Sequence, residues 1–192
     1  MNTELINTKS RYNYMPLVKK MILCHFGAAI MGIMISFSNN TYLNIFTALL
    51  SFAFYMYVLY TSVWDIGAKD KLAIDGKRMA ADKLVGLKAA LYANIPSFVL
   101  GALCIIGRAL GAFASLDFGN TVAYWANILA RFWNGMYIGI FVVLQPASPT
   151  ELEAVLYMFI YIAATIPALL MCYLAYNAGI KGFRIIPEKK KD

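Results

Sequence analysis

Five long apolar runs most constrain what this chain can fold into. They cover residues 21–37, 42–63, 89–112, 121–145 and 152–178. A helix needs about 20 mainly apolar residues to cross the hydrocarbon layer of a membrane, and each run is close to that length. Because 61% of the 192 residues are apolar, a soluble globule of this size could not bury them all. The sequence therefore predicts an all-helical transmembrane bundle that forms a single integral membrane domain over residues 1–192.

Lys and Arg gather in three segments beside these runs. The polar N-terminal arm (1–17) with the flank of the first run holds four, the loop at 64–88 holds six, and the tail at 179–192 holds five, of seventeen in the chain. The connections that hold none are 38–41, 114–120 and 146–150. Segments rich in Lys and Arg stay in the cytoplasm. We therefore expect a multi-pass protein of the cell membrane whose two termini and 64–88 loop are cytoplasmic.

Termini on the same side require an even number of crossings, but the chain has five apolar runs. The run at 121–145 has the weakest claim to cross, because Arg131 lies near its middle, where a charge costs about 2.5–3.5 kcal/mol on insertion scales. We expect four spans, with 121–145 forming a helix or a bent helical hairpin that stays on the outer side or re-enters the membrane. The alternative is five spans.

The polar residues of this run fall on one stripe of a helix. Asn120, Tyr124, Asn127, Arg131 and Asn134 follow one another at spacings of four, three, four and three, as the residues of one helical face do. An arginine that faces a cavity can hold an anionic group through its planar guanidinium. The stripe is therefore a candidate ligand-binding site, formed by Tyr124, Asn127, Arg131 and Asn134.

The same residues permit a purely structural interpretation. Arg131 could lie at the outer membrane interface, paired with Asp117, with Glu151 or with a lipid phosphate, and only fix the depth of its segment.

Arg108 lies near the outer end of the third run, and Asp117 is its nearest candidate partner in the sequence. His25, the single histidine, is expected to lie near the cytoplasmic end and to bond to a neighbour or to lipid headgroups, with a proton relay as the alternative.

Glycine and alanine in two runs favour close packing between helices. Gly27, Ala28 and Gly32 lie in the first run, and Gly107 and Gly111 are spaced as in the G-x-x-x-G pattern of the third. Small residues at such spacings let two helix backbones approach each other in a membrane.

Prolines and capping residues predict where helices bend and begin. Pro96 should kink the third span, and Pro167 should bend the last one. Ser148 or Thr150 can cap the last helix, whose first turn is acidic.

A second candidate site lies where the second run meets the 64–88 loop. Trp64, Asp65, Lys69 and Asp70 form a W-D-x-G-x-K-D pattern that could be a docking surface for a partner protein. Alternatively, Trp64 anchors the exit from the membrane, Asp65 caps the next helix, and Gly67 allows a turn between them.

The following residues contain an Asp75-Gly76 turn signal and the sequence D-K-L-V-G-L-K-A-A-L-Y-A-N-I-P. Over residues 57–98 this pattern resembles small multi-span membrane proteins of low-GC Gram-positive bacteria that have no assigned role. The resemblance implies a bacterial cytoplasmic membrane and brings no activity with it.

Enzymatic motifs are missing from the sequence. It contains no phosphate-binding glycine loop, no H-E-x-x-H and no C-x-x-C, and Cys24, Cys104 and Cys172 all fall in apolar runs. His25 lies next to Cys24, and adjacent helical residues point apart. We therefore expect no enzyme, no cofactor and no metal. Because the net charge of +7 is explained by topology, we also expect no nucleic-acid partner.

These features favour a small non-enzymatic membrane protein that is an accessory or membrane subunit of a larger assembly. Its expected partners are the lipid bilayer and either another protein or a second copy of the chain. The alternative is a small transporter or channel for an anionic or amphipathic ligand that uses the polar stripe around Arg131. Apart from Glu153 in the first turn of the last run, no acidic residue lies inside the four expected spans, which argues against a proton-coupled or cation-coupled mechanism.

Overall fold

The computed structural model describes residues 13–35 and 41–183, and within these ranges it contains helices and no strand. This confirms the predicted all-helical class. The elements are α1 (Met15–Ile35), α2 (Thr41–Asp75), α3 (Val85–Ala93), α4 (Ile95–Phe113), α5 (Asp117–Trp133), the 3-10 helix η1 (Gly135–Tyr137), α6 (Ile138–Leu144), α7 (Glu151–Met158), α8 (Ile160–Ala163) and α9 (Ile166–Lys181). Most of the predicted N-terminal arm and the last nine residues of the basic tail lie outside the described residues.

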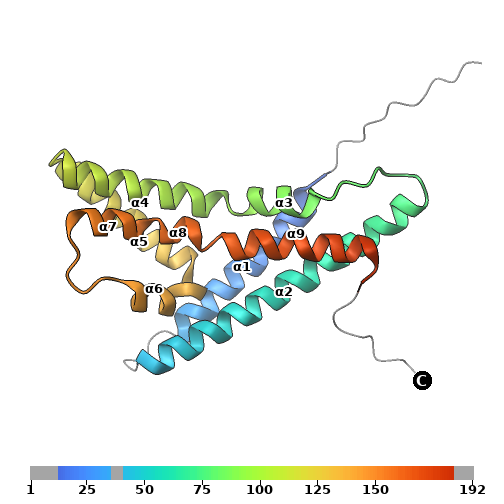
Figure 1. Cartoon of the computed structure of the whole chain (residues 1–192), viewed down its shortest axis with the longest axis horizontal. Helices are drawn as coiled ribbons and strands as arrows, with labels where there is room; N and C mark the ends of the chain where they lie inside the picture. The colour runs from blue at the N-terminus through green and yellow to red at the C-terminus, as the bar shows by residue number, and fades with distance from the viewer. Residues whose placement is uncertain (1–12, 36–40, 184–192) are drawn as a thin grey trace, which may run out of the picture.

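Four helical segments of the described chain are long and apolar enough to cross a membrane, as predicted. They are Met15–Met34, Tyr42–Asp75, Ile95–Phe113 and Glu151–Lys181, the last comprising α7, α8 and α9. The fifth apolar run forms α5, η1 and α6, and its two parts are bent by 85° relative to each other. Both parts lie in the left-hand half of Figure 1. The fifth run is therefore a bent helical segment, and its return without crossing a membrane stays a prediction.

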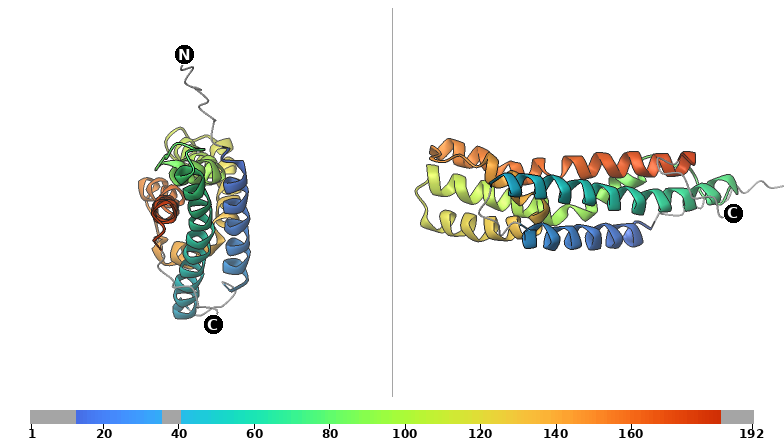
Figure 2. Two further views of the ribbon diagram at one scale, coloured as in Figure 1. Left: turned by 90° about the vertical axis from the view of Figure 1, so that its right-hand side faces the viewer. Right: turned by 90° about the horizontal axis from the view of Figure 1, so that it is seen from below.

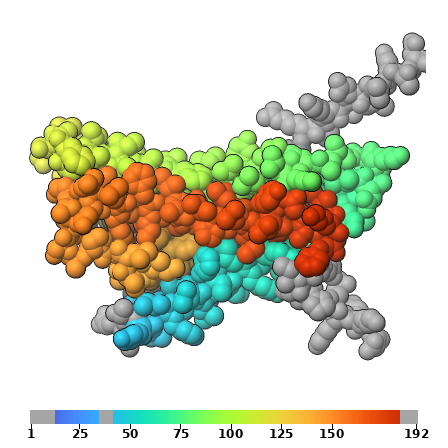
Figure 3. All heavy atoms as spheres, viewed as in Figure 1, coloured from blue at the N-terminus to red at the C-terminus, as the bar shows by residue number. Residues whose placement is uncertain are grey.

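The bundle is elongated, with α4 and α9 along its long axis and α1 and α2 inclined to it (Figure 1 and Figure 2). The start of α1, the α2–α3 connection and the end of α9 lie toward one end, on the right in Figure 1. We call this the basic end, because these segments contain or adjoin the three Lys- and Arg-rich stretches. The α4–α5 connection and the start of α7 lie at the opposite end. In Figure 3, the α7–α9 segment covers the face between α3–α4 and α2.

Helix α2 continues for 35 residues, well beyond the predicted second run. The expectation that Asp65 caps a new helix and that Gly67 allows a turn is wrong, because both residues lie inside α2. Packing against α9 explains the continuation. A Cβ atom on Gly67 would lie 2.5 Å from the carbonyl oxygen of Tyr176, so the two backbones touch. Residues 64–75 of the predicted loop are thus helical.

The predicted turn at Asp75 and Gly76 is confirmed. Helix α2 ends at Asp75, the N–H of Arg78 bonds to the Ala73 carbonyl at 2.9 Å, and Lys77 has φ 55°. The left-handed residue of this helix end is therefore Lys77 and not the glycine before it.

A salt bridge lies at the other end of the α2–α3 connection. Lys88 Nζ is 2.7 Å from Asp82 Oδ2. The hydrogen bond from Lys88 lowers the pKa of the Asp82 carboxyl below its ordinary value, and the backbone N–H of Leu84 adds to the effect. The pair joins the connection to the first turn of α3.

Both predicted proline effects appear as helix interruptions. Helix α3 ends at Ala93 and α4 starts at Ile95, with Pro96 in the first turn of α4. Between α8 and α9 the chain breaks just ahead of Pro167. A proline cannot donate to the carbonyl four residues earlier, so the helix restarts at each of them.

Helix α1 begins earlier than predicted. Residues 15–17 were expected to belong to the polar arm, but they form the first turn of α1. Leu17 is 1% exposed and packs in the core with Val18 and Met21. Burial of these apolar side chains stabilises the first turn.

Small residues bring helices into backbone contact at the predicted positions. A Cβ atom on Gly107 of α4 would lie 2.8 Å from the Ala123 nitrogen of α5, and one on Gly32 of α1 would lie 2.5 Å from the Gly135 carbonyl oxygen. Gly27 differs, because nothing lies within 4 Å of its added Cβ position. The α4–α5 hairpin and the contact between α1 and η1 both hold the fifth apolar run in place.

Candidate functional site

The polar stripe of α5 lines a cavity of about 380 Å³ between α4, α5, α7 and the α6–α7 connection. This volume falls within the range of about 300–1,000 Å³ that is usual for small-molecule sites. The cavity is lined by Arg108, Asn120, Ala123, Tyr124, Asn127, Arg131, Gln145, Pro146, Pro149, Ala154, Tyr157 and Met158. Two cations therefore face it together with neutral polar groups and apolar side chains.

Three of the four predicted site residues, Tyr124, Asn127 and Arg131, line this cavity. Asn134 does not. It is 1% exposed and its side-chain amide donates to the Ala130 carbonyl at 3.0 Å. Helix α5 ends at Trp133, so the helical period on which the stripe was extended no longer applies at position 134.

Neutral groups surround the guanidinium of Arg131. Its Nε donates to Asn127 Oδ1 at 3.3 Å and to the Tyr161 hydroxyl at 3.4 Å, and its Nη2 donates to Gln145 Oε1 at 2.8 Å. Tyr161 is fully buried and donates its own proton to Asn127 Oδ1. This network holds the guanidinium in one orientation. Its Nη1 makes no bond to a described residue.

The carboxylates suggested by the sequence do not pair with Arg131. The salt bridges among the described residues are Lys88–Asp82 and Arg108–Glu151. An arginine cannot lose its proton in a protein, and a partly buried charge without a counter-ion is costly. The geometry therefore leaves Arg131 with a charge that an anion can neutralise.

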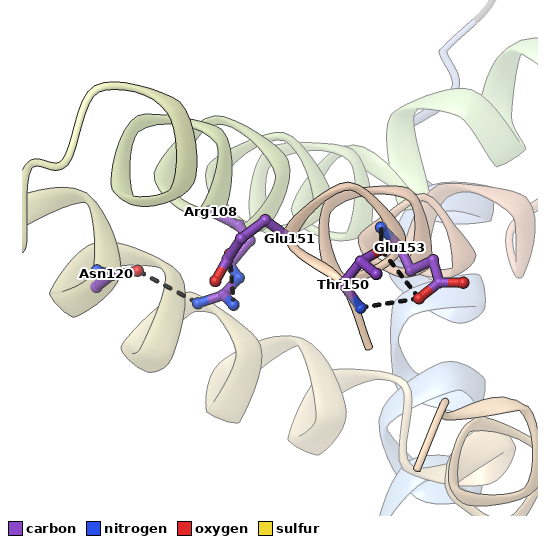
Figure 4. A network of polar contacts seen from close by, with 5 residues as sticks. All are labelled: Arg108, Asn120, Thr150, Glu151 and Glu153. Carbon is purple, nitrogen blue, oxygen red and sulfur yellow. Dashed lines mark hydrogen bonds and ion pairs between the residues drawn. The ribbon is translucent and has the colours of Figure 1, made fainter. Parts of the chain in front are cut away.

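Arg108 has a different environment. Its Nη2 lies 2.9 Å from Glu151 Oε2, and its Nη1 donates to Asn120 Oδ1 at 3.3 Å (Figure 4). The prediction that Asp117 is its partner is wrong. Helix α7 packs against α4 and begins at Glu151 with Thr150 as its cap, which brings the Glu151 carboxylate to the arginine.

The cap of α7 is a reciprocal capping box, as the sequence favoured. The Thr150 hydroxyl accepts from the Glu153 backbone N–H at 3.3 Å, and Glu153 Oε2 accepts from the Thr150 N–H at 2.8 Å (Figure 4). This arrangement satisfies backbone groups at the helix start. It therefore fixes the chain beside the cavity.

Side chains from other helices satisfy the backbone where α5 breaks. In a continued helix the Tyr137 N–H would reach the Trp133 carbonyl, but it bonds to the Asn134 carbonyl instead. His25 Nε2 lies 3.0 Å from the Trp133 carbonyl oxygen, so this nitrogen carries the proton, while Nδ1 accepts from the Tyr55 hydroxyl at 3.2 Å. The expectation that His25 bonds to a neighbour is confirmed.

A side chain from another helix also bonds to the backbone of α6, on the other side of the bend. The Tyr157 hydroxyl donates to the Phe141 carbonyl at 2.6 Å. Non-helical backbone at membrane depth requires such partners. The fold thus supplies donors to both arms of the bend.

Two residues of the second candidate site, Trp64 and Asp70, form hydrogen bonds within the protein. Trp64 is 9% exposed and its Nε1 donates to the Phe183 carbonyl at 2.6 Å, and the Tyr176 hydroxyl donates to Asp70 Oδ2 at 2.8 Å. Both contacts join α2 to the end of the chain's last helix. Asp65 and Lys69 are exposed. A docking role for these two residues stays a prediction.

Sequence reasoning missed three residues of the site. Gln145 and Tyr161 bond to Arg131 from 14 and 30 residues away in the sequence, and Tyr157 lines the same cavity. Tyr157 and Tyr161 are spaced four apart in the last apolar run, which places two hydroxyls on one helical face. That spacing was the available signal.

Comparison with protein-family models, with curated proteins and with solved structures gave no match.

Proposed function

We propose that this chain is a non-enzymatic integral membrane protein that binds an anionic amphiphile in the cavity between α4, α5 and α7. The basic end lies in the cytoplasm, and α5 and α6 enter the membrane from the outer side and return without crossing. The single observation that carries the proposal is the guanidinium of Arg131, held by Asn127, Tyr161 and Gln145 at a cavity wall without a carboxylate partner among the described residues.

The lining of the cavity favours an amphiphile over a small inorganic anion. Ala123, Pro146, Pro149, Ala154 and Met158 supply an apolar part beside the polar groups. An anionic head group would meet Arg131 while an apolar chain lies along these residues. The guanidinium binds phosphate or carboxylate oxygens through parallel hydrogen bonds.

The topology supports the same proposal. The α5 and α7 helices, which line the cavity, lie toward the end of the molecule opposite the basic end (Figure 1), and the positive-inside rule puts that end on the outer side. A ligand would therefore enter from the outer leaflet or the outer aqueous phase. Membership in a larger assembly stays a prediction, and binding in the cavity does not depend on it.

Lipid binding by the detergent-solubilised full chain tests the proposal. Native mass spectrometry would follow titration with phosphatidylglycerol and, for comparison, with zwitterionic phosphatidylcholine. We expect Arg131→Gln to weaken phosphatidylglycerol binding by roughly 10- to 100-fold, since a hydrogen bond to a charged group contributes about 1.5–3 kcal/mol. Arg131→Lys should restore part of it, because the charge stays and the planar fork is lost.

Lys19→Gln is the matched control, because this exposed cation of α1 does not line the cavity. Unchanged phosphatidylglycerol binding by Arg131→Gln would refute the proposal. Competition by millimolar inorganic phosphate would identify the ligand as a small anion and overturn the amphiphile part.

A further inference from the structure

The side chains around the cavity carry more positive than negative charges. Arg108 and Arg131 are the charged side chains among its lining residues. The Glu151 carboxylate neutralises Arg108 at 2.9 Å. Glu153, in the same helical turn, bonds to Thr150 and does not line the cavity. The site therefore carries one net positive charge.

The two arginines also differ in what they can offer a ligand. Both terminal nitrogens of Arg108 are engaged, Nη1 by Asn120 and Nη2 by Glu151 (Figure 4). Arg131 is bound by neutral acceptors and keeps Nη1 for a further acceptor. A negative oxygen would thus be received by Arg131, and Glu151 would repel a second negative charge placed near Arg108.

We infer that the cavity selects singly charged head groups, phosphodiesters over phosphomonoesters, because Glu151 cancels the charge of Arg108. This inference rests on the proposed function and names the class of ligand that the site takes. A monoanion matches the single uncompensated cation. A dianion would bring one negative charge into a partly desolvated site without a partner, and unpaired charges there are strongly disfavoured.

Two lipids that differ by one methyl group test this selectivity. Phosphatidylmethanol is a phosphodiester with one charge, and phosphatidic acid with the same acyl chains is a phosphomonoester with two charges at pH about 8.5, since the second phosphate pKa is about 6. We expect the wild-type chain, titrated in detergent and followed by native mass spectrometry, to bind phosphatidylmethanol about tenfold or more tightly.

Glu151→Gln raises the net charge of the site to two and should reverse the preference. Glu153→Gln is the matched control, because it removes a carboxylate from the same turn while glutamine can still complete the capping box, and its preference should equal that of the wild type. Equal or tighter binding of phosphatidic acid by the wild-type chain would overturn the inference, as would an unchanged ratio in Glu151→Gln. Loss of Arg131 dependence for both lipids would instead overturn the proposed function.

Discussion

At the scale of single residues, the carbonyl group of Trp133 needs a hydrogen-bond donor from outside its own helix. It lies where α5 ends, inside an apolar bundle. The Tyr137 N–H, which would bond to it in a continued helix, bonds to the Asn134 carbonyl instead. A buried carbonyl without a donor costs about 1–3 kcal/mol. The Nε2 of His25, from α1, donates this hydrogen bond. One histidine therefore links the start of the chain to the shape of the candidate site.

Replacing His25 with phenylalanine should destabilise the protein by about 1–3 kcal/mol, because the Trp133 carbonyl loses its donor in a buried position. Thermal unfolding of the purified chain in detergent would measure the loss. His25→Gln, which keeps a side-chain N–H, should recover part of it. Tyr55→Phe removes only the bond to the other ring nitrogen and should cost less than His25→Phe. Equal stability of wild type and His25→Phe would contradict this role.

At the scale of elements, the contact between α2 and α9 organises the basic end. Their backbones touch at Gly67 and Gly179, and two polar contacts, from Trp64 and Tyr176, continue the contact toward the helix ends. Helix α2 is about 50 Å long at 1.5 Å per residue, whereas the hydrocarbon layer is about 30 Å thick. An α2 that crosses a membrane along its normal would therefore extend beyond the hydrocarbon layer.

Gly179→Ala should destabilise the protein by about 1–3 kcal/mol, a usual cost of overpacking. Its Cβ would meet the Trp64 carbonyl oxygen and lie 2.9 Å from the Ala68 nitrogen, and rigid backbone cannot move aside. Gly27→Ala is the control, since its Cβ meets nothing within 4 Å and alanine is the better helix former by about 1 kcal/mol. Unfolding temperatures in detergent should fall for the first variant and hold or rise for the second. The opposite order would show that the helices do not approach so closely.

At the scale of the whole molecule, charge and shape divide the bundle into two ends. The start of α1, the α2–α3 connection and the end of α9, which contain or adjoin the Lys- and Arg-rich stretches of the sequence, lie toward the basic end, while the α4–α5 connection and the start of α7 lie at the other (Figure 1). An even number of crossings is consistent with this division, and the 85° bend between α5 and η1–α6 turns the second part of the fifth apolar run away from the direction of α5.

Accessibility of single cysteines tests this topology in a variant without Cys24, Cys104 and Cys172. If α5 and α6 return without crossing, Asp117→Cys and Ala147→Cys should both react with a membrane-impermeant thiol reagent added to intact cells. Ala81→Cys, in the α2–α3 connection, should react only after the membrane is permeabilised. Labelling of one outer site but not the other would mean five crossings, and labelling of position 81 in intact cells would reverse the orientation.

The sequence alone determined the features that depend on a few neighbouring residues. Hydropathy over about 20 residues identified the four helices of spanning length, Pro96 and Pro167 marked two interruptions, and Thr150 marked the start of α7. The helical period placed Tyr124, Asn127 and Arg131 on one face, and the structure puts that face on a cavity. These signals are local because backbone hydrogen bonds in a helix connect residues only four apart.

Only the tertiary structure decided which side chains meet across helices. Arg108 pairs with Glu151, 43 residues away, and not with the nearer Asp117. Packing against α9 carries α2 past Asp65, and the break after Trp133 removes Asn134 from the polar stripe. No local pattern encodes these outcomes, because each depends on how closely two helix backbones approach and on which end of a neighbouring helix lies beside the side chain. The uncompensated charge of Arg131 is a consequence of the same packing, since it assigns the available carboxylate to Arg108.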